Sequence, residues 1–184
     1  MFSDPILPVT AGLIDTPMGR MLALVDAAGA LVGLDFERDD GGPTAGQRQL
    51  RRRGLEAAPA GPDSPGLARV RAQLDEYFAG RRRAFDLVLA PLGTPFQHRV
   101  WAALCAIPGG VTLSYRDLAL RLGEPRAIRA VGTANGANPI AVVVPCHRLI
   151  GSDGSLTGYA GGLHRKAALL ELEGARPPSL SLAG

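Results

Sequence analysis

Cysteine, lysine, histidine and aromatic residues are all scarce in this chain of 184 residues, and each shortage excludes something. With only two cysteines, Cys105 and Cys146, there is no disulfide framework, and a reducing, cytoplasmic compartment is expected. Three histidines and two cysteines leave almost no ligands for zinc, so we expect no metal and no other cofactor. No apolar run approaches the roughly 18–20 residues that cross a bilayer, and no secretory leader is recognisable, so no membrane association is expected.

Two abundances exclude further classes of protein. The hydrophobic fraction of 46% is ordinary for a globular protein and too high for a disordered chain. The 24 glycines and 15 prolines would interrupt any long heptad repeat, which excludes a coiled coil. Lys166 is the only lysine among 20 basic residues, and the remaining arginines stay charged and suit phosphate recognition.

The net charge of +3 is unevenly distributed along the chain. Residues 1–90 carry eleven arginines and twelve acids, a balance of −1, whereas residues 91–184 carry nine basic residues and five acids, a balance of +4. We therefore expect the second half to face an acidic partner such as nucleic acid. Charge alone leaves open the alternative of an ordinary solvated basic surface.

Residues 1–90 are predicted to form a small N-terminal domain in which an antiparallel sheet carries a helix. Apolar runs at 21–25 and 31–36 are separated by turn residues, which is typical of a β-hairpin, and a strand near 10–15 is expected to join it.

Two further features of this half follow the hairpin. Residues 37–66 are rich in Gly, Pro, Asp and Arg and predict a long surface loop. Apolar residues at helical spacing predict a helix over 67–78 that ends at Gly80, and 85–89 reads as a last strand.

Residues 91–184 are predicted to form a mainly helical C-terminal domain, which makes the fold class α+β. The segment 91–93 reads as the linker, and Thr94 before Pro95 predicts an N-cap with proline at the first helical position. That helix is expected to end at Pro108.

A helix-turn-helix of the winged-helix-like kind is expected next. Ser114 caps the second helix with Asp117 as its capping-box partner, and this helix ends at Gly123. A third helix is predicted over 126–134, and the short turn between the two helices gives helix-turn-helix spacing. A plain helical hairpin is the alternative.

The third helix presents small side chains, among them Ala127 and Ala130, together with Arg129. A major-groove reader would place longer polar side chains on base edges. A face of small residues suits sequence-indifferent approach to a groove, with Arg129 as the long side chain that reaches into the base stack.

The sharpest feature is Cys146, which follows an apolar run and precedes His147 and Arg148. Two basic neighbours favour the thiolate, which is the nucleophilic form, and His147 is the natural base. An inert core cysteine is the alternative, and that reading is the one we adopt for Cys105.

A base of this kind needs an orienting carboxylate. The acids nearby in sequence are Asp153, Glu171 and Glu173, and the last of these follows a helix predicted over 163–172. The residues alone leave the choice between Glu171 and Glu173 open.

The segment Pro145-Cys146-His147-Arg148 closely resembles the active-site signature of the O6-alkylguanine-DNA alkyltransferases. The resemblance is strong from about Thr94 to Gly174 and only architectural over residues 1–90. The other residues that stand where that family has them are Ser114-Tyr115, Arg129-Ala130-Val131-Gly132, Asn138-Pro139, residues 158–163, Lys166 and Glu173-Gly174.

The resemblance implies a reaction and the residues that perform it. Cys146 takes the alkyl group from O6 of guanine in one irreversible step, His147 acts as base through a water molecule, and Glu173 holds the other nitrogen of His147. Tyr115 donates a proton to the purine ring so that guanine leaves neutral, and it acts with Ser114 on the backbone phosphate of the rotated nucleotide.

The resemblance also assigns the DNA and pocket contacts. Arg129 fills the space that the flipped base leaves, and Asn138 ties the turn before the active-site segment to the helix-turn-helix. Tyr159 and Ala160 wall the pocket, where some members carry Ser in place of Ala160. Leu149, which stands where the family commonly has Val, reads the exocyclic amine through its backbone. The remaining DNA-contact candidates are Ala127, Ala130 and Arg148.

The prediction is therefore stoichiometric repair of alkylated double-stranded DNA, bound through the minor groove by a monomer, without a cofactor. O4-alkylthymine is left open as a second substrate. Two alternatives stand beside it: a thiol hydrolase with a Cys–His pair, and a helix-turn-helix DNA binder with an incidental cysteine.

Overall fold

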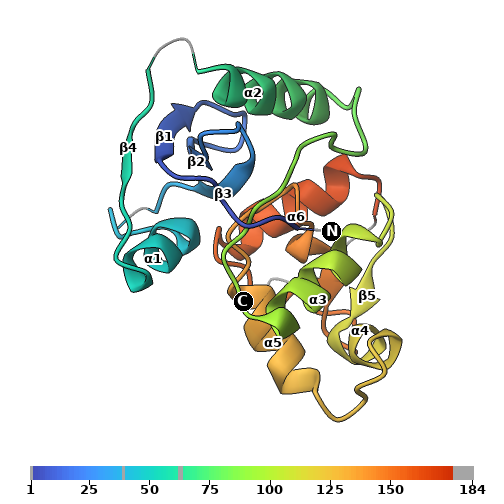
Figure 1. Ribbon diagram of the computed structural model, residues 1–184. Helices are drawn as coiled ribbons and strands as arrows, with labels where there is room; N and C mark the ends of the chain where they lie inside the picture. The colour runs from blue at the N-terminus through green and yellow to red at the C-terminus, as the bar shows by residue number, and fades with distance from the viewer. Residues whose placement is uncertain (1, 39, 62–63, 176–184) are drawn as a thin grey trace.

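The computed structural model describes residues 2–38, 40–61 and 64–175. Its elements, in chain order, are β1 (Val9–Ile14), β2 (Met21–Val25), β3 (Leu31–Phe36), α1 (Ala45–Arg52), β4 (Ala57–Pro59), α2 (Pro65–Phe78), α3 (Pro95–Cys105), β5 (Leu113–Ser114), α4 (Tyr115–Arg121), α5 (Ile128–Gly136), the 3-10 helix η1 (Cys146–Arg148), β6 (Leu149–Ile150) and α6 (Leu163–Leu172). The strands of the first half form one body with α1 and α2, and α3 to α6 gather beside it (Figure 1). The fold is α+β, as predicted.

The N-terminal sheet has four strands in the order β3-β2-β1-β4. The predicted hairpin is confirmed as the antiparallel pair β2 and β3, and β1 pairs antiparallel with β2. The expectation of a purely antiparallel sheet is wrong, because β4 adds parallel to β1 over a three-residue register from Val9 with Ala57.

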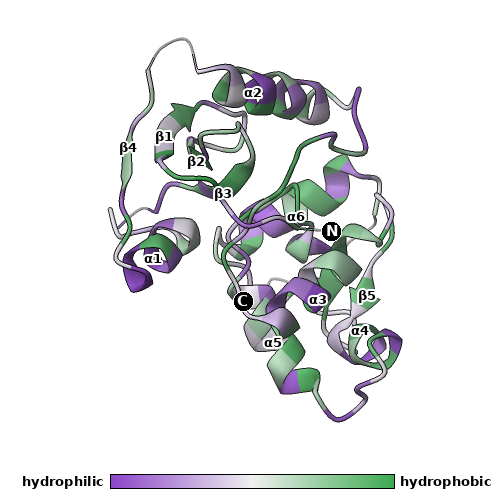
Figure 2. Cartoon of the chain, viewed as in Figure 1, coloured by the Kyte–Doolittle hydropathy of each residue, from purple (hydrophilic) through white to green (hydrophobic). Residues whose placement is uncertain are grey.

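Helices cover both faces of this sheet. Successive side chains of a strand point to opposite faces, and the apolar ones pack on either side. Ala23 belongs to the main core together with Val70 and Leu74 of α2. Leu24, its neighbour in β2, packs in a second cluster with Leu50 of α1. Hydrophobic colouring accordingly runs through the central strands in Figure 2.

Two predictions about the first half are corrected. The segment 37–66 is not a single loop, since it contains α1 and β4. Helix α1 begins at a capping box in which Thr44 accepts from the backbone of Gln47 and the Gln47 side chain accepts from the backbone of Thr44. The expected strand at 85–89 is reduced to one isolated bridge, between Leu89 and Leu31.

The caps predicted for the first two helices of the second half are confirmed. Thr94 caps α3, and Ser114 caps α4 in a capping box with Asp117. Helix α5 begins at Ile128 and ends at Gly136, two residues later at each end than predicted. The turn from α4 therefore extends through Pro125 and Arg126, where proline disfavours helical continuation.

The outer edge of β3 carries backbone hydrogen bonds to two later segments, residues 88–90 and 139–141. The amide of Leu34 donates to the carbonyl of Pro139 at 2.7 Å, and the amide of Ala141 donates back to Leu34 at 2.6 Å. Leu31 exchanges a similar pair of bonds, each 2.8 Å, with Val88 and Ala90. The N-terminal sheet thus holds the segment that leads to Cys146.

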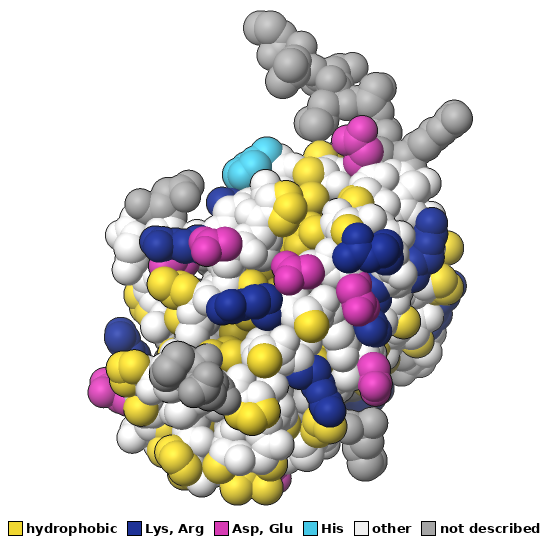
Figure 3. Space-filling view, turned by 90° about the horizontal axis from the view of Figure 1, so that it is seen from above, with side chains coloured by type: hydrophobic (Ala, Val, Ile, Leu, Met, Phe, Trp, Pro, Cys, Tyr) yellow, Lys and Arg dark blue, Asp and Glu magenta, His cyan; other side chains and the backbone are white. Residues whose placement is uncertain are grey.

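The surface above α2 is of mixed charge. On the face seen in Figure 3, Lys and Arg side chains are interspersed with Asp and Glu side chains. This face is not the continuous basic surface that nucleic acid favours. No helix in the described ranges is long and apolar enough to cross a membrane.

Candidate active site

Cys146 opens the short helix η1, directly after Pro145, and its side chain is only 7% exposed. Burial raises the pKa of the thiol to about 11, although a hydrogen bond with the Asn138 side chain acts in the opposite direction. The expectation that the flanking His147 and Arg148 favour a thiolate is therefore wrong for the free protein. The thiol is protonated at neutral pH and needs a base.

His147 follows Cys146 in η1 and is fully buried. Burial lowers its pKa against the opposing effect of Glu173, so the ring is neutral at pH 7. Nε2 lies 3.0 Å from Oε1 of Glu173 and donates to it, because a carboxylate only accepts. Nδ1 then carries a lone pair, and it has no partner in the part of the chain that the structure describes. A neutral ring that a carboxylate orients and that keeps a lone pair can act as a general base.

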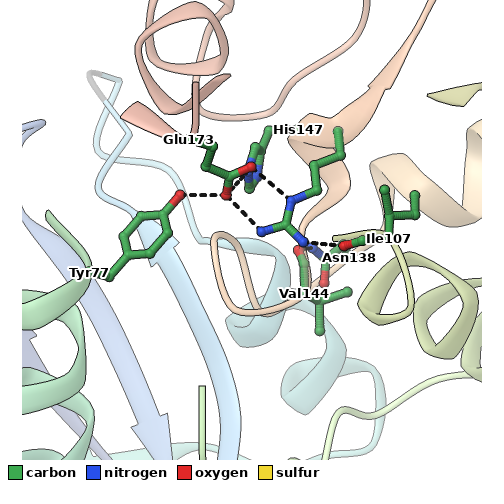
Figure 4. Close-up of polar contacts among 7 residues, drawn as sticks. Tyr77, Ile107, Asn138, Val144, His147 and Glu173 are labelled. Carbon is green, nitrogen blue, oxygen red and sulfur yellow. Dashed lines mark hydrogen bonds and ion pairs between the residues drawn. The ribbon is translucent and has the colours of Figure 1, made fainter. Parts of the chain in front are cut away.

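Glu173 is the centre of a buried polar cluster (Figure 4). It accepts from His147, from Tyr77 at 2.8 Å, and from two nitrogens of Arg148, each at 2.8 Å. Burial opposes ionisation, but the hydrogen bonds and charges of His147 and Arg148 hold the pKa of Glu173 well below its usual range. Of the acids that the sequence left open, Glu173 is therefore the one in contact with His147.

Arg148, which the sequence analysis gave as a DNA-contact candidate, does not lie at the surface. Its side chain is in the interior, where Nε and Nη2 donate to Glu173 and Nη1 donates to the carbonyl of Ile107 (Figure 4). With only 6% of the residue exposed, the guanidinium is not available to a DNA phosphate. Its charge instead compensates the buried carboxylate, which would otherwise be costly.

Tyr77 is a participant that the sequence analysis missed. It was assigned to the apolar face of a helix, and its ring does pack in the core. Its hydroxyl reaches Glu173 across 96 residues of sequence. No local pattern in the chain signals such a contact.

A pocket opens onto Cys146. Asn138, Tyr159 and Ala160 line it, as the resemblance implied, and Asp35 of β3 contributes to it from the N-terminal sheet. The complete lining is Asp35, Asn135, Gly136, Asn138, Ala141, Cys146, Gly158, Tyr159, Ala160 and Gly161.

Asn138 holds the backbone before the nucleophile. Its Nδ2 donates to the carbonyls of Ile140 at 3.3 Å and Val144 at 2.9 Å, and its Oδ1 accepts from the amide of Ile140 at 3.0 Å. These bonds shape a turn in which Val142 adopts a φ of 70°. A β-branched residue rarely takes that conformation, so the local backbone is strained.

Leu149 and Tyr115 do not line this pocket. The Leu149 side chain is buried, and its carbonyl accepts from Nζ of Lys166, which also donates to the carbonyl of Thr157. Tyr115 begins α4 next to the Ser114 cap, and its hydroxyl donates to the same Thr157 carbonyl at 3.3 Å.

The helix expected to face DNA presents its side chains at the surface. Arg129 and Ala130 are exposed on α5, and Ala127 is half-buried at its N-cap. One expectation nearby is wrong: Cys105, assigned to the core, is exposed at the end of α3. Within the described ranges, no group of three or more His, Cys, Asp and Glu side chains could hold a metal ion.

Comparison with known proteins links this geometry to one family. The model of the ribonuclease-like domain of 6-O-methylguanine DNA methyltransferase matches residues 9–91, and that of its DNA-binding domain matches residues 95–175. The methylated-DNA–protein-cysteine methyltransferase of Mycobacterium bovis is 55% identical over 118 residues, which cover 64% of this chain and 72% of that protein. The protein of the same name from Methanosarcina barkeri is 60% identical over 101 residues, 55% of this chain and just under two thirds (64%) of its own length.

Solved structures agree. The O6-methylguanine methyltransferase of Mycobacterium tuberculosis superposes with a TM-score of 0.75 at 42% identity, covering 94% of this chain and 96% of that one. The same protein in complex with DNA gives a TM-score of 0.74 at 43% identity, covering 91% and 94%. By these matches to both of its halves, the chain belongs to the 6-O-methylguanine DNA methyltransferase family.

Proposed function

We propose that this chain repairs alkylated DNA by moving the alkyl group from O6 of guanine to Sγ of Cys146. The observation that carries the proposal is that Cys146 lines a pocket and directly precedes the buried His147, which is paired with Glu173. A nucleophile, a neutral base and a carboxylate that orients the base are the parts that alkyl transfer to sulfur requires.

The proposed transfer begins at the thiol of Cys146. The thiol proton passes through a water molecule to Nδ1 of His147, and the thiolate forms a bond to the alkyl carbon. The bond between that carbon and O6 breaks, and its electron pair stays on O6. Tyr115 donates a proton to a ring nitrogen, so guanine remains in the DNA as a neutral base, and the proton on His147 replaces the one that Tyr115 gave up.

The transfer consumes the protein. The alkyl carbon is saturated, so no tetrahedral oxyanion forms at that carbon, and the product is a thioether. We therefore propose one turnover for each chain and no cofactor. The transfer as proposed uses no metal ion and no organic cofactor.

The target atom is stacked inside duplex DNA, so the base has to be flipped into the pocket, at a cost of a few kcal/mol. What supports Arg129 as the residue that fills the gap is its exposure on α5 beside small side chains such as Ala130. We propose approach through the minor groove, where close contact favours small residues. Pocket contacts are proposed for Asn138, Tyr159, Ala160 and the backbone of Leu149.

We also propose an oligomeric state and a compartment for the protein. A single chain carries the whole constellation, so we propose that the free protein is a monomer. A nucleophilic thiol requires reducing conditions, and we propose the cytoplasm as its place of work.

Intact-protein mass spectrometry tests the proposal. The protein is incubated with a duplex that contains one O6-methylguanine. We expect a mass gain of one methyl group on the peptide that contains Cys146, ending at one equivalent. Cys105→Ser provides the matched control, because this exposed thiol should be dispensable, whereas Cys146→Ser should gain no mass.

The same experiment separates the alternatives. A thiol hydrolase would release product over many turnovers and leave the protein mass unchanged. A DNA binder with an incidental cysteine would bind the duplex, but the mass of the unmodified protein would stay unchanged and no product would be released. Either result would overturn the proposal.

A further inference from the structure

The pocket in front of Cys146 carries an acid from the other half of the chain. Asp35 lies near the end of β3, next to Leu34, whose backbone bonds with Pro139 and Ala141 bring β3 against the active-site segment. Asp35 lines the pocket together with Cys146 and Tyr159. The sequence analysis did not single out this residue, because a lone Asp in an apolar strand indicates no site.

Asp35 is poorly compensated for a buried carboxylate. It is 7% exposed, and its hydrogen bond from the amide of Ala45 is long, at 3.5 Å. Arg48 and Arg38 attract it only through space, since no ion pair joins either of them to Asp35. A buried carboxylate without a close cation is usually costly, and such groups are more often found in functional sites.

The charge of Asp35 reaches the reacting group. After burial, it is the next factor that raises the pKa of the Cys146 thiol. It also raises the pKa of Tyr159, where its effect follows those of burial and of Cys146. During transfer the carbon of the O6 substituent lies on Sγ of Cys146, so the outer atoms of that substituent lie in the same pocket and in the field of the same carboxylate.

From this placement we propose that Asp35 is a specificity-determining residue that rejects anionic O6 substituents. The inference rests on the proposed alkyl transfer. Methyl and hydroxyethyl groups, which are neutral, enter beside Asp35 without electrostatic cost. A carboxymethyl group brings a second carboxylate into a pocket of low dielectric, where like charges repel strongly.

The discrimination depends on pH with a defined sign. Burial raises the pKa of Asp35 to about 6, against the opposing effects of the Ala45 and Phe36 amides, Arg48 and Arg38. Above pH 6 the residue is ionised and repels the carboxymethyl group; below pH 6 it becomes neutral and the repulsion fades. In free DNA the substituent is ionised across this range, because an ordinary carboxyl group titrates near pH 4, so it has to enter the pocket from its charged form.

The test compares rate constants for transfer from three duplexes, each with one O6-methyl-, O6-(2-hydroxyethyl)- or O6-carboxymethylguanine. The quantity of interest is the ratio of the carboxymethyl rate to the methyl rate, in which the pH dependence of Cys146 and His147 cancels. For the unmodified protein we expect this ratio to fall about tenfold from pH 5 to pH 8. Asp35→Asn should raise the ratio at pH 8 by about the same factor and flatten its pH profile.

The hydroxyethyl duplex controls for size, since its substituent is similar in bulk but neutral. Asp15→Asn, an exposed acid of the same half, controls for net charge and should leave the ratio unchanged. A ratio that Asp35→Asn leaves unchanged, or a hydroxyethyl rate reduced as much as the carboxymethyl rate, overturns the proposal. If Asp35→Asn does not fold, the pH profile of the unmodified protein decides alone. Absence of methyl transfer in the unmodified protein would instead refute the proposed function.

Discussion

Tyr77 donates a hydrogen bond of 2.8 Å to the same oxygen of Glu173 that accepts from His147, Oε1. A helix of the N-terminal half thereby completes the surroundings of a carboxylate near the C-terminal end of the described chain. The two halves share this buried polar cluster, in addition to the backbone bonds between them.

Replacing Tyr77 with Phe removes one donor and keeps the ring in the core. We expect a loss of about 1.5–3 kcal/mol in the free energy of unfolding, because the lost bond is to a charged group. Alkyl transfer should slow by less than about tenfold, since His147 keeps its contact with Glu173. Urea unfolding and single-turnover kinetics measure the two effects. An unchanged stability would show that the bond contributes nothing.

Arg148 and Arg129 should separate stability from DNA binding. Arg148→Met leaves Glu173 buried without its main cation and should destabilise the fold by about 3–5 kcal/mol.

Arg129→Ala removes an exposed side chain and should change stability by no more than about 0.5 kcal/mol. It should weaken repair of duplex DNA more than reaction with free O6-methylguanine. Equal losses on both substrates would argue against a role for Arg129 in the base stack.

Asp35 should make the protein less stable as the pH rises. Its pKa is raised on folding, so the folded state binds the proton more tightly, and stability falls as the pH rises from about 4 to about 6. At pH 8 we expect Asp35→Asn to be more stable than the unmodified protein by about 2–3 kcal/mol, and the difference should vanish near pH 4. Urea unfolding at the two pH values measures it, and a difference of equal size at both would contradict the assignment.

Glu173 should have the opposite pH dependence. Its pKa is depressed on folding, so its contribution to stability is present above the ordinary carboxyl pKa and is lost as the pH falls through the folded value. Glu173→Gln should therefore be less stable than the unmodified protein at pH 7, with the gap narrowing in acid. The variant should also slow alkyl transfer while leaving DNA affinity nearly intact. A normal transfer rate would remove Glu173 from the mechanism.

Much of the second half was readable from the sequence because its signals are local. The caps at Thr94 and Ser114 lie within a few residues of the helices they start, and the structure has both. Helix α1 was missed although Thr44 and Gln47 carry the same capping signal, because the surrounding Gly, Pro and Arg residues outweighed it. The parallel strand β4 was missed because it is short and pairs with a strand far away in sequence.

The residues that surround Cys146 and His147 were harder to predict than these two residues themselves. Cys146 and His147 stand in one recognisable segment. Tyr77 and Asp35 enter the site only through tertiary packing, and each lies in a run of residues that reads as ordinary core. Arg148 shows the converse: its charge indicated the surface, whereas its contact with Glu173 takes it inside.

The backbone bonds between Leu34 and the pair Pro139 and Ala141 have a consequence for engineering this chain. A fragment that kept only the second half would lose the template against which the strained turn at Val142 is set. Cys146 would remain in the sequence, but the backbone that orients its side chain would lose its support. Any shortened reagent derived from this protein should therefore retain β3, or a designed strand that supplies the same edge.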